Sequence, residues 1–526
     1  MSFIDAFVNH AKEMPGRIAL SDTLRSWRYG ELATLACDLA NDLNWCAPDS
    51  GTVAIVMGKS PEMVIAILGV LLSGRCYVPI DPTIPTECRQ RILMDSNATV
   101  LLCRAEDAAA SVWPGQPASL CRLRVSAELP RQTGLESLVK PVLPHHKSNN
   151  LAAILYTSGS TSTPKGVMLG WGAFDKFTTW AARYFDLGAD DRVASHAPFG
   201  FDISILDLFA TFLVGGHVVL VPEEHLINGR YLVQFLEREK ITFWQSVPAP
   251  LIALVSAELD GDLGFPDLRH VISTGEAISA AVVGRLGRMA PNMMFHNIYG
   301  CTETNDSFIF TSSTRKLCLD APIPVGRAIE YIDYKIVDGQ DRPVPLGVPG
   351  ELLVASPVAF EGYTDRRLTE KACVDLDGKR YFRTRDRVFQ GRDEVVHFLC
   401  RTDTTVKIRG YRIDLAEVEA CLLRVKIAKE VAVVSVLHPV KGKCLVGVLS
   451  IQLGDSSSIS PIGLKQHCAQ MLPRQAIPDW FEIQTTALPH NKNGKIDRHN
   501  LARIIQEKIN HQYQDRKDKK CRHFMK

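Results

Sequence analysis

Short apolar runs alternate with helical patterns from about residue 50 to about residue 400, and this alternation limits the possible folds more than any other feature. Patterns of buried strands occur at residues 51–58, 99–103, 151–157, 217–222 and 270–274. Between them, residues 61–74 and 229–240 have the period and length of helices. Near-continuous apolar strands separated by helices are typical of parallel sheets that helices cover on both faces. The sequence therefore predicts an α/β fold.

The pattern changes after about residue 400. Residues 415–425 and 461–472 are predicted helices, and residues 431–437 and 444–453 are predicted paired strands. We therefore expect a large N-terminal domain, residues 1–400, with mostly parallel sheets layered with helices. A small, mobile C-terminal α+β domain, residues 401–511, should follow. The charged stretch 512–526 is expected to lack regular structure.

Composition excludes several classes of protein. The 526 residues include 60 basic and 58 acidic residues, a net charge of +2, so we expect neither a nucleic-acid nor a membrane partner. The longest apolar run, Met63–Leu72, is too short to span a bilayer, and the N-terminus has no signal-peptide layout. The 14 cysteines are scattered without a C-x-x-C pair, which favours reduced thiols over metal or redox use. These features predict a soluble, cytoplasmic protein.

A polar loop directly follows the predicted strand at residues 151–157. Small and hydroxylated residues let main-chain N–H groups converge on phosphate, and Lys165, between a proline and a glycine, supplies a positive charge. This is not a P-loop, since the lysine precedes the second glycine. The predicted phosphate-binding residues are Thr157, Ser158, Gly159, Ser160, Thr161 and Lys165.

This loop is one of eight segments that resemble, in order, the motifs of the adenylate-forming enzymes. That superfamily comprises acyl-CoA synthetases, luciferases and the adenylation domains of nonribosomal peptide synthetases. The amino-acid-activating branch is the most similar, and a stand-alone amino acid–carrier-protein ligase is the nearest type. Besides the loop, the segments are CYVPIDPTIP (76–85), FDISILDLF (201–209), NIYGCTETN (297–305), PGELLVASPVAFEGY (349–363), YFRTRDRV (381–388), FLCRTDTTVKIRGYRIDLAEVE (398–419) and LPHNKNGKIDR (488–498).

Four positions depart from the motifs of this superfamily. Three of them stand where the motifs have glycine: Ser162, Arg385 and Cys400. The fourth, Cys301, stands where the motifs have proline. None of these changes removes a charged group, so we expect them to affect rate and loop dynamics more than reaction type.

The resemblance implies that a carboxylate attacks the α-phosphate of ATP and expels pyrophosphate, with ATP and Mg²⁺ bound. Thr302 and Glu303 would contact the phosphates and Mg²⁺, since a hard cation prefers a carboxylate. Lys495 would bridge the substrate carboxylate and the developing phosphate charge, although a lone surface lysine is usually only solvated. For the nucleotide, the resemblance implies contacts from Tyr299, Asp386 and Arg401.

The resemblance also implies a second step, in which a thiol attacks the acyl adenylate. The small domain would rotate about a hinge at Asp403, and the segment from Lys407 to Gly410 would then face the thiol tunnel. A static linker is the alternative.

Asp202 is the predicted discriminator between substrates. In amino-acid-activating members the corresponding aspartate pairs with the substrate's ammonium group, and a buried carboxylate requires such a cationic partner. A structural aspartate that caps a helix is the alternative. The other predicted pocket residues are Phe201, Ile203, Leu206, Gln245, Ile272, Thr274, Ile298, Asp306 and Ser307.

The sequence leaves the amino acid undetermined. It contains neither a carrier-protein phosphopantetheine site nor a condensation motif, so we expect the enzyme to load a separate, phosphopantetheinylated carrier protein in nonribosomal-peptide-type biosynthesis. Two alternatives remain: an acyl- or aryl-CoA ligase, and an inactive nucleotide-binding scaffold. Joint retention of Lys165, Glu303, Asp386, Arg401 and Lys495 argues against the scaffold.

Overall fold

The computed structural model describes most of the chain. It covers residues 2–48, 51–104, 120–128, 150–157, 164–257, 264–313, 322–425, 428–438, 441–451, 460–490 and 496–524. Two compact units form. The first comprises Met1–Pro82, Thr86–Thr157 and Pro164–Thr402, and the second consists mainly of the chain from Asp403 onward.

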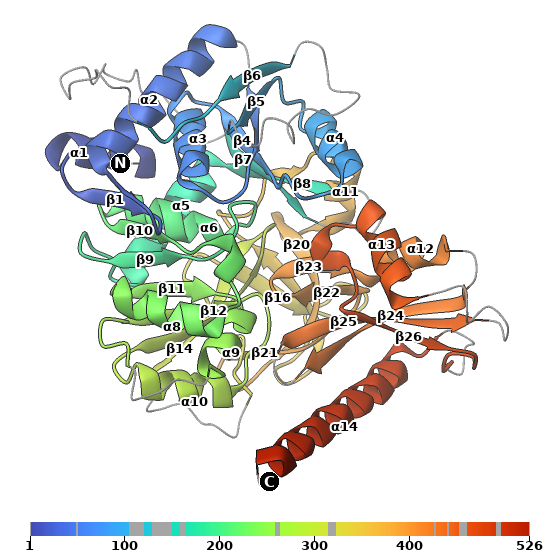
Figure 1. Ribbon diagram of the computed structural model, residues 1–526. Coiled ribbons are helices and arrows are strands. Elements are labelled where there is room, and N and C mark those ends of the chain that lie inside the picture. The colour runs from blue at the N-terminus through green and yellow to red at the C-terminus, as the bar shows by residue number, and fades with distance from the viewer. Residues whose placement is uncertain are drawn as a thin grey trace. The chain divides into compact units, whose positions relative to one another are not determined.

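A seven-stranded sheet in the first unit has the order β18-β8-β7-β4-β3-β5-β6 (Figure 1). Its strands are β3 (Thr52–Val56), β4 (Cys76–Ile80), β5 (Val100–Cys103), β6 (Cys121–Arg124), β7 (Leu151–Thr157), β8 (Lys165–Gly170) and β18 (Gly362–Tyr363). The five strands from β7 to β6 run parallel, and β8 and β18 add antiparallel partners at one edge. The predicted strands at 51–58, 99–103 and 151–157 are thus present.

A nine-stranded sheet has the order β15-β14-β13-β12-β11-β9-β10-β1-β2. Its strands are β1 (Ile18–Ser21), β2 (Ser26–Arg28), β9 (Arg192–Ser195), β10 (His217–Leu220), β11 (Phe243–Ser246), β12 (His270–Thr274), β13 (Met294–Cys301), β14 (Asn305–Ser313) and β15 (Arg327–Ala328). Six central strands, from β13 to β1, are parallel, as the apolar runs predict.

Helices cover these sheets. They are α1 (Phe3–Glu13), α2 (Tyr29–Cys46), α3 (Pro61–Leu72), α4 (Thr86–Asp95), α5 (Trp171–Tyr184), α6 (Ile203–Ile205), α7 (Thr211–Leu213), α8 (Gly229–Arg238), α9 (Pro248–Val255), α10 (Ala280–Met289) and α11 (Arg366–Ala372). In Figure 1, α8, α9 and α10 lie along the nine-stranded sheet, and their apolar side chains form one core with it. A larger core joins α1, α2, α3 and α5 with strands of both sheets. The predicted α/β fold is confirmed.

Helix α3 explains the longest apolar run of the chain. Ser60 caps its N-terminus by accepting a hydrogen bond from the backbone N–H of Met63, and Pro61 occupies the first turn, where its missing N–H costs nothing. Every residue of the helix except Glu62 is buried. Because α3 contacts other elements all round, it is apolar all round.

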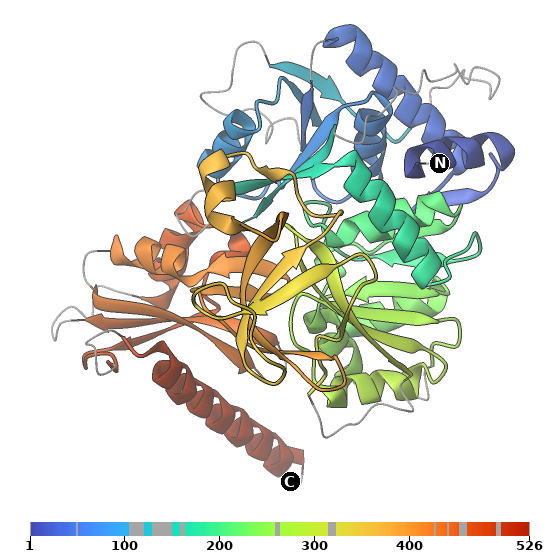
Figure 2. The same ribbon diagram turned by 180° about the vertical axis from the view of Figure 1, so that it is seen from behind.

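An antiparallel sheet, which the sequence did not predict, completes the first unit (yellow and orange strands in Figure 2). It consists of β16 (Asp333–Val337), β17 (Gly350–Ala355), β19 (Cys373–Leu376), β20 (Lys379–Gln390) and β21 (Val396–Arg401). Strand β20 pairs with β17, β19 and β21, so it is the centre of this sheet.

The second unit contains the predicted helices α12 (Leu415–Leu423) and α13 (Pro461–Met471) and the predicted strand pair β24 (Ala428–His438) and β25 (Gly442–Ile451). Four further elements were not predicted. The strand β26 (Trp480–Gln484) joins β25 in parallel, β22 (Thr405–Ile408) and β23 (Tyr411–Asp414) form a separate hairpin, and α14 (Arg498–Phe524) contacts β24.

The charged stretch after residue 511 differs from the expectation. Instead of lacking regular structure, residues 512–524 continue α14, whose first turns bury Leu501, Ile505 and Ile509 against the sheet. The sequence from 498 to 524 contains no glycine or proline, and glutamine, lysine and arginine favour helix. An anchored helix can therefore extend through the charged residues.

Two further predictions concern membrane-spanning helices and the cysteines. None of the helices within the described ranges combines the length and apolarity needed to cross a membrane. The cysteines within those same ranges are free thiols, as predicted, and many of them are buried.

Candidate functional site

The predicted phosphate loop connects β7 to β8. Thr157 ends β7 and lies opposite Lys165, the first residue of β8, in the antiparallel register. A Cβ atom on Gly166 would lie 2.7 Å from Thr364 Cγ2 and 2.9 Å from Tyr156 Cζ, so the residue after the lysine must be glycine. The predicted residues Ser158, Gly159, Ser160 and Thr161 lie outside the described residues, as does Lys495.

Tyr363 brings Lys165 and Glu303 together. Its hydroxyl donates a 2.6 Å hydrogen bond to Glu303 Oε1, and the ammonium of Lys165 lies 6.0 Å from the centroid of its ring. Glu303 is only 1% exposed, and its backbone carbonyl accepts a 2.9 Å hydrogen bond from the N–H of Phe360. The segment that contains β18 therefore fixes both the side chain and the backbone of the predicted metal ligand.

Thr302 and Glu303 belong to the tight turn between β13 and β14. Gly300 makes this turn possible, because a Cβ atom there would lie 2.1 Å from the carbonyl oxygen of Asn305. Cys301, at the position where the related motifs have proline, pairs with Asn305, and its sulfur lies 3.3 Å from Thr304 Oγ1. The turn keeps its hydrogen-bonded form without the proline.

Asp386 is held by two side chains from neighbouring strands. Tyr299, on β13, donates a short hydrogen bond to Asp386 Oδ2, and Arg401, on β21, donates a 2.6 Å hydrogen bond to Oδ1. Burial, and then the charge of Asp386, raise the pKa of Tyr299 well above its ordinary value. The phenol therefore remains a donor, and three predicted nucleotide-binding residues form one polar group. We call Lys165, Tyr299, Glu303, Tyr363, Asp386 and Arg401 the charged cluster.

Arg385 adopts a conformation suited to glycine. Its φ of 62° lies in the left-handed region, which side chains with a Cβ atom rarely occupy. The backbone N–H of Asp386 donates to Thr384 Oγ1 at 3.1 Å, and that hydroxyl donates to Leu352 O at 2.8 Å. The arginine therefore keeps the strained turn that the glycine of related motifs would adopt easily.

A second group of predicted residues lies where adjacent parallel strands end. Gln245 is the third residue of β11, Thr274 ends β12, and Ile298 lies opposite Thr274 on β13. All three are buried, and Gln245 Oε1 has no hydrogen-bond partner among the described residues. In α/β sheets, ligands bind outside the carboxyl ends of the strands.

Phe201 and Asp202 follow β9, the next strand of the same sheet, and both are partly buried. Asp202 precedes α6, yet its side chain makes no capping hydrogen bond to that helix. The helix-cap alternative is therefore not supported. We call Phe201, Asp202, Gln245, Thr274 and Ile298 the strand-end cluster.

Asp306 lies on β14, opposite Gly300, and is 9% exposed. Burial, and then the charge of Asp306, raise the pKa of Tyr331. The carboxylate of Asp306 therefore interacts electrostatically with Tyr331, which lies in the turn between β15 and β16. A role of Asp306 in a substrate pocket stays a prediction.

The second unit contains the residues predicted for the hinge and the thiol step. Asp403 is its first residue after Thr402, and Asp403 Oδ1 accepts a 3.1 Å hydrogen bond from the N–H of Thr405. Lys407 lies on β22. The β22–β23 hairpin turns at Arg409 and Gly410, whose φ values of 52° and 86° are those of a type I′ turn. The predicted roles of these residues remain untested.

Sequence reasoning missed Tyr363. Tyr363 ends the segment PGELLVASPVAFEGY (349–363), and its place directly after Gly362 in that motif could have marked it as a candidate. Only the fold shows that its hydroxyl reaches Glu303.

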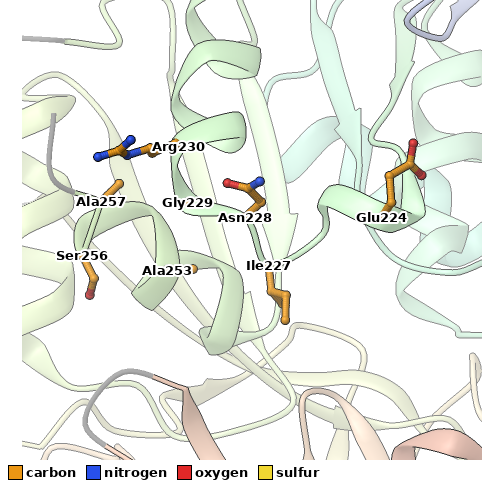
Figure 3. A pocket seen from close by; sticks show the side chains of 8 residues that line it. All are labelled: Glu224, Ile227, Asn228, Gly229, Arg230, Ala253, Ser256 and Ala257. Carbon is orange, nitrogen blue, oxygen red and sulfur yellow. The ribbon is translucent and has the colours of Figure 1, made fainter.

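A surface pocket between the start of α8 and the end of α9 contains no predicted site residue (Figure 3). Its lining residues are Glu224, Ile227, Asn228, Gly229, Arg230, Ala253, Ser256 and Ala257.

Comparison with known families decides the classification. The profile of the AMP-binding enzyme family matches residues 7–364, and that of the AMP-binding enzyme C-terminal domain matches residues 417–495. The chain belongs to the AMP-binding enzyme family. The predicted resemblance to adenylate-forming enzymes is thus confirmed.

Relatives of this member occur as parts of large proteins and as separate chains. It is 34% identical over 509 residues to a linear gramicidin synthase of Brevibacillus parabrevis, but these residues are 94% of this chain and 6% of that protein. It is also 34% identical to an L-proline–[L-prolyl-carrier protein] ligase of Pseudomonas fluorescens, over 85% of this chain and 88% of that protein.

A solved structure supports the fold. The Vibrio cholerae adenylation domain AlmE, in complex with glycyl-adenosine-5'-phosphate, matches with a TM-score of 0.82 and 22% identity and covers 96% of both chains.

Proposed function

We propose that this AMP-binding enzyme activates an amino acid with ATP and transfers it to the phosphopantetheine thiol of a separate carrier protein. In the first step, a carboxylate oxygen of the amino acid attacks the α-phosphorus of ATP. The bond to the β-phosphate breaks, which gives aminoacyl-AMP and pyrophosphate. In the second step, the thiol attacks the acyl carbon, AMP leaves with the electron pair of the acyl–oxygen bond, and a thioester forms.

The observation that carries this proposal is the strand-end cluster. Gln245, Thr274 and Ile298 come together at the carboxyl ends of adjacent parallel strands, and Asp202 follows the next strand. A pocket with an apolar wall, an amide and a carboxylate suits a ligand that is apolar in part and carries a cationic group. An amino acid meets this requirement through its ammonium group, which would pair with Asp202.

The unsatisfied carbonyl oxygen of Gln245 supports the same conclusion. A buried polar atom without a partner costs free energy, and a ligand that donates a hydrogen bond removes that cost. We assign this oxygen to the bound amino acid.

The charged cluster would bind the phosphates. Lys165 would lie against the triphosphate, and Glu303 would hold Mg²⁺ together with phosphate oxygens. Within the described ranges no group of three or more His, Cys, Asp or Glu side chains could hold a metal by itself. Mg²⁺ usually binds through one or two carboxylates plus substrate phosphates, so a single buried carboxylate fits the ion. When bound, the ion neutralises charge that develops on the phosphates.

Asp386 would accept hydrogen bonds from the ribose hydroxyls. The fixed orientation of its carboxylate, between Tyr299 and Arg401, favours such a role, since a preorganised acceptor loses little freedom when ligand binds. Tyr299 would border the adenine, and Thr302 would contact phosphate from the turn after β13.

The second unit would supply groups for both steps. Lys495 would approach the reacting carboxylate and phosphate in the first. After rotation about Asp403, the hairpin that contains Lys407 and Gly410 would accompany the thiol in the second. The carrier protein would be a separate chain, and the product would enter nonribosomal-peptide-type biosynthesis.

Amino-acid-dependent ATP–pyrophosphate exchange tests the first step, with the proteinogenic amino acids and D-alanine as probes. We expect one amino acid, or a few similar ones, to stimulate exchange. Release of AMP with free pantetheine or with coenzyme A as the thiol then tests the second. Exchange only with fatty or aryl acids, followed by transfer to coenzyme A, would instead establish an acyl- or aryl-CoA ligase. Absence of exchange with every acid would contradict both.

A further inference from the structure

A partly buried lysine, Lys59, contacts the end of β9, the strand that precedes Phe201 and Asp202, and takes no part in the proposed chemistry. Lys59 follows β3 in the loop before α3. Its ammonium donates a hydrogen bond to the carbonyl oxygen of Ser195, the last residue of β9, and lies 5.6 Å from the centroid of the Phe199 ring. Its backbone N–H donates a 3.0 Å hydrogen bond to Glu223, which follows β10.

Asp207 is the acidic counterpart of Lys59. It is completely buried in a π-helical turn, Leu206–Ala210, that continues the short helix after Asp202. Burial raises the pKa of Asp207, and Lys59 is the strongest opposing charge. Burial likewise lowers the pKa of Lys59, against Asp207 and Glu223. Single π-helical turns within helices occur often at functional sites.

These contacts join elements from two sheets. Lys59 comes from the carboxyl end of β3 in the seven-stranded sheet, whereas Ser195 and Glu223 follow strands of the nine-stranded sheet. The chain between Ser195 and Asp207 contains Phe201 and Asp202. Lys59 therefore holds the beginning of this segment through a hydrogen bond, and Asp207, at the end of the segment, is the acidic residue that acts most strongly on its pKa.

We propose that Lys59 and Asp207 are positioning residues for the amino acid substrate. Lys59 fixes the beginning of the segment Ser195–Asp207, the buried Asp207 lies at its end, and together they place the carboxylate of Asp202 where the substrate's ammonium group binds. This inference rests on the proposed function. A fully buried aspartate is costly unless a cation compensates it, so the pairing of Asp207 with the partly buried Lys59 requires an explanation beyond apolar packing.

ATP–pyrophosphate exchange tests the inference, with the amino acid that gives the fastest exchange with wild type as the probe. Lys59→Met removes the ammonium but keeps an unbranched apolar side chain. We expect the KM for the amino acid to rise at least about tenfold and the KM for ATP to change less than about twofold. Lys59→Arg keeps the charge and the donor, and should recover most of the affinity for the amino acid.

Arg192→Met is the matched control. Arg192 begins the same strand, β9, and pairs with Glu239 at 3.1 Å, at the end opposite to Ser195. Its loss removes a partly buried cation from one end of β9. We expect lower thermal stability with both KM values unchanged.

Lys59→Met leaves Asp207 buried without its cation, so the double variant Lys59→Met, Asp207→Leu separates positioning from stability. Replacing both partners with apolar side chains is often neutral for stability. We expect the double variant to have a melting temperature close to that of wild type and a KM for the amino acid that stays raised.

Return of the KM of the double variant to the wild-type value would overturn the inference. An unchanged KM in folded Lys59→Met would also overturn it. Wild type distinguishes this inference from the proposed function. If wild type shows no amino-acid-dependent exchange, both the proposed function and the positioning role are wrong. If wild type is active, the variants test the positioning role alone.

Discussion

The charged cluster and the strand-end cluster lie in the same unit but hold their polar atoms differently. In the charged cluster, Glu303 and Asp386 accept hydrogen bonds from Tyr363, Tyr299 and Arg401. In the strand-end cluster, the carbonyl oxygen of Gln245 has no partner among the described residues. In the charged cluster the protein itself orients the carboxylates through hydrogen bonds, whereas the carbonyl oxygen of Gln245 is available to a ligand.

This difference fits two kinds of ligand. ATP is the same in every adenylate-forming enzyme, so its contacts can be fixed by a network of side chains within the protein. The acid differs between enzymes, and a pocket with an unsatisfied polar atom selects the ligand that completes it. Substitutions in the charged cluster should therefore change ATP binding, and substitutions in the strand-end cluster should change amino acid binding.

Asp202→Ala should give the largest selective effect. Its loss leaves the substrate's ammonium group without a counter-charge, at a cost of about 3–5 kcal/mol, which corresponds to a decrease in kcat/KM for the amino acid of at least about a hundredfold. Exchange kinetics measure this, and the KM for ATP should change less than about twofold. If kcat/KM fell equally for the amino acid and for ATP, the two clusters would not bind different substrates.

Tyr299→Phe should give the reverse pattern. The variant loses a hydrogen bond to a buried carboxylate, worth about 1.5–3 kcal/mol, so ATP affinity should fall about tenfold or more while the amino acid KM stays constant. Calorimetric titration with ATP provides the measurement. Tyr334→Phe is the control, because Tyr334 accepts a 2.8 Å hydrogen bond from Gln390 in the antiparallel sheet, outside the charged cluster.

Acid should destabilise the region of the strand-end cluster through His196, the residue after Ser195. Burial, and then Lys59, lower the pKa of His196 from 6.5 to about 3. The folded state favours the neutral imidazole of His196. The free energy of unfolding that this residue contributes is therefore fully present above pH 6.5, and it is lost as the pH falls toward 3. At pH 5 the loss is about 1–2 kcal/mol.

Urea unfolding at pH 7.5 and pH 5 measures that loss in wild type and in His196→Gln. The variant should lose less stability between the two values. An identical loss in both proteins would show that His196 does not contribute.

Arg385→Gly should give the smallest effect, and a favourable one. Glycine adopts a φ of 62° without strain, so the variant should be more stable by about 1 kcal/mol and bind ATP as well as wild type. Thermal unfolding measures the gain. Arg380→Gly, in the regular part of β20 where Arg380 lies opposite Asp375, should instead lower the melting temperature.

The sequence predicted those elements that depend on local pattern. Buried parallel strands and helices such as α3 and α8 have the expected period, and glycines such as Gly300 and Gly166 mark close approaches of the backbone. Motif order grouped residues that the fold brings together, including Asp386 with Arg401 and Gln245 with Thr274, and their roles toward ligands stay predictions.

The sequence could not predict contacts that only long-range pairing creates. Tyr363 meets Glu303 across 60 positions because β18 adds to β8, and Lys59 meets Ser195 across 136 positions because two sheets lie near each other. The antiparallel sheet was missed because its strands are partly exposed and mix charged with apolar residues. The helix after residue 511 was missed because charge alone was taken to indicate disorder.

The most direct measurement compares wild-type exchange with the activated amino acid and with its des-amino analogue. If Asp202 binds an ammonium group, kcat/KM for the amino acid should exceed that for the analogue by at least about a hundredfold. If the analogue is used as well as the amino acid, or better, the ammonium-binding role of Asp202 is wrong and the enzyme activates an acid without an amino group.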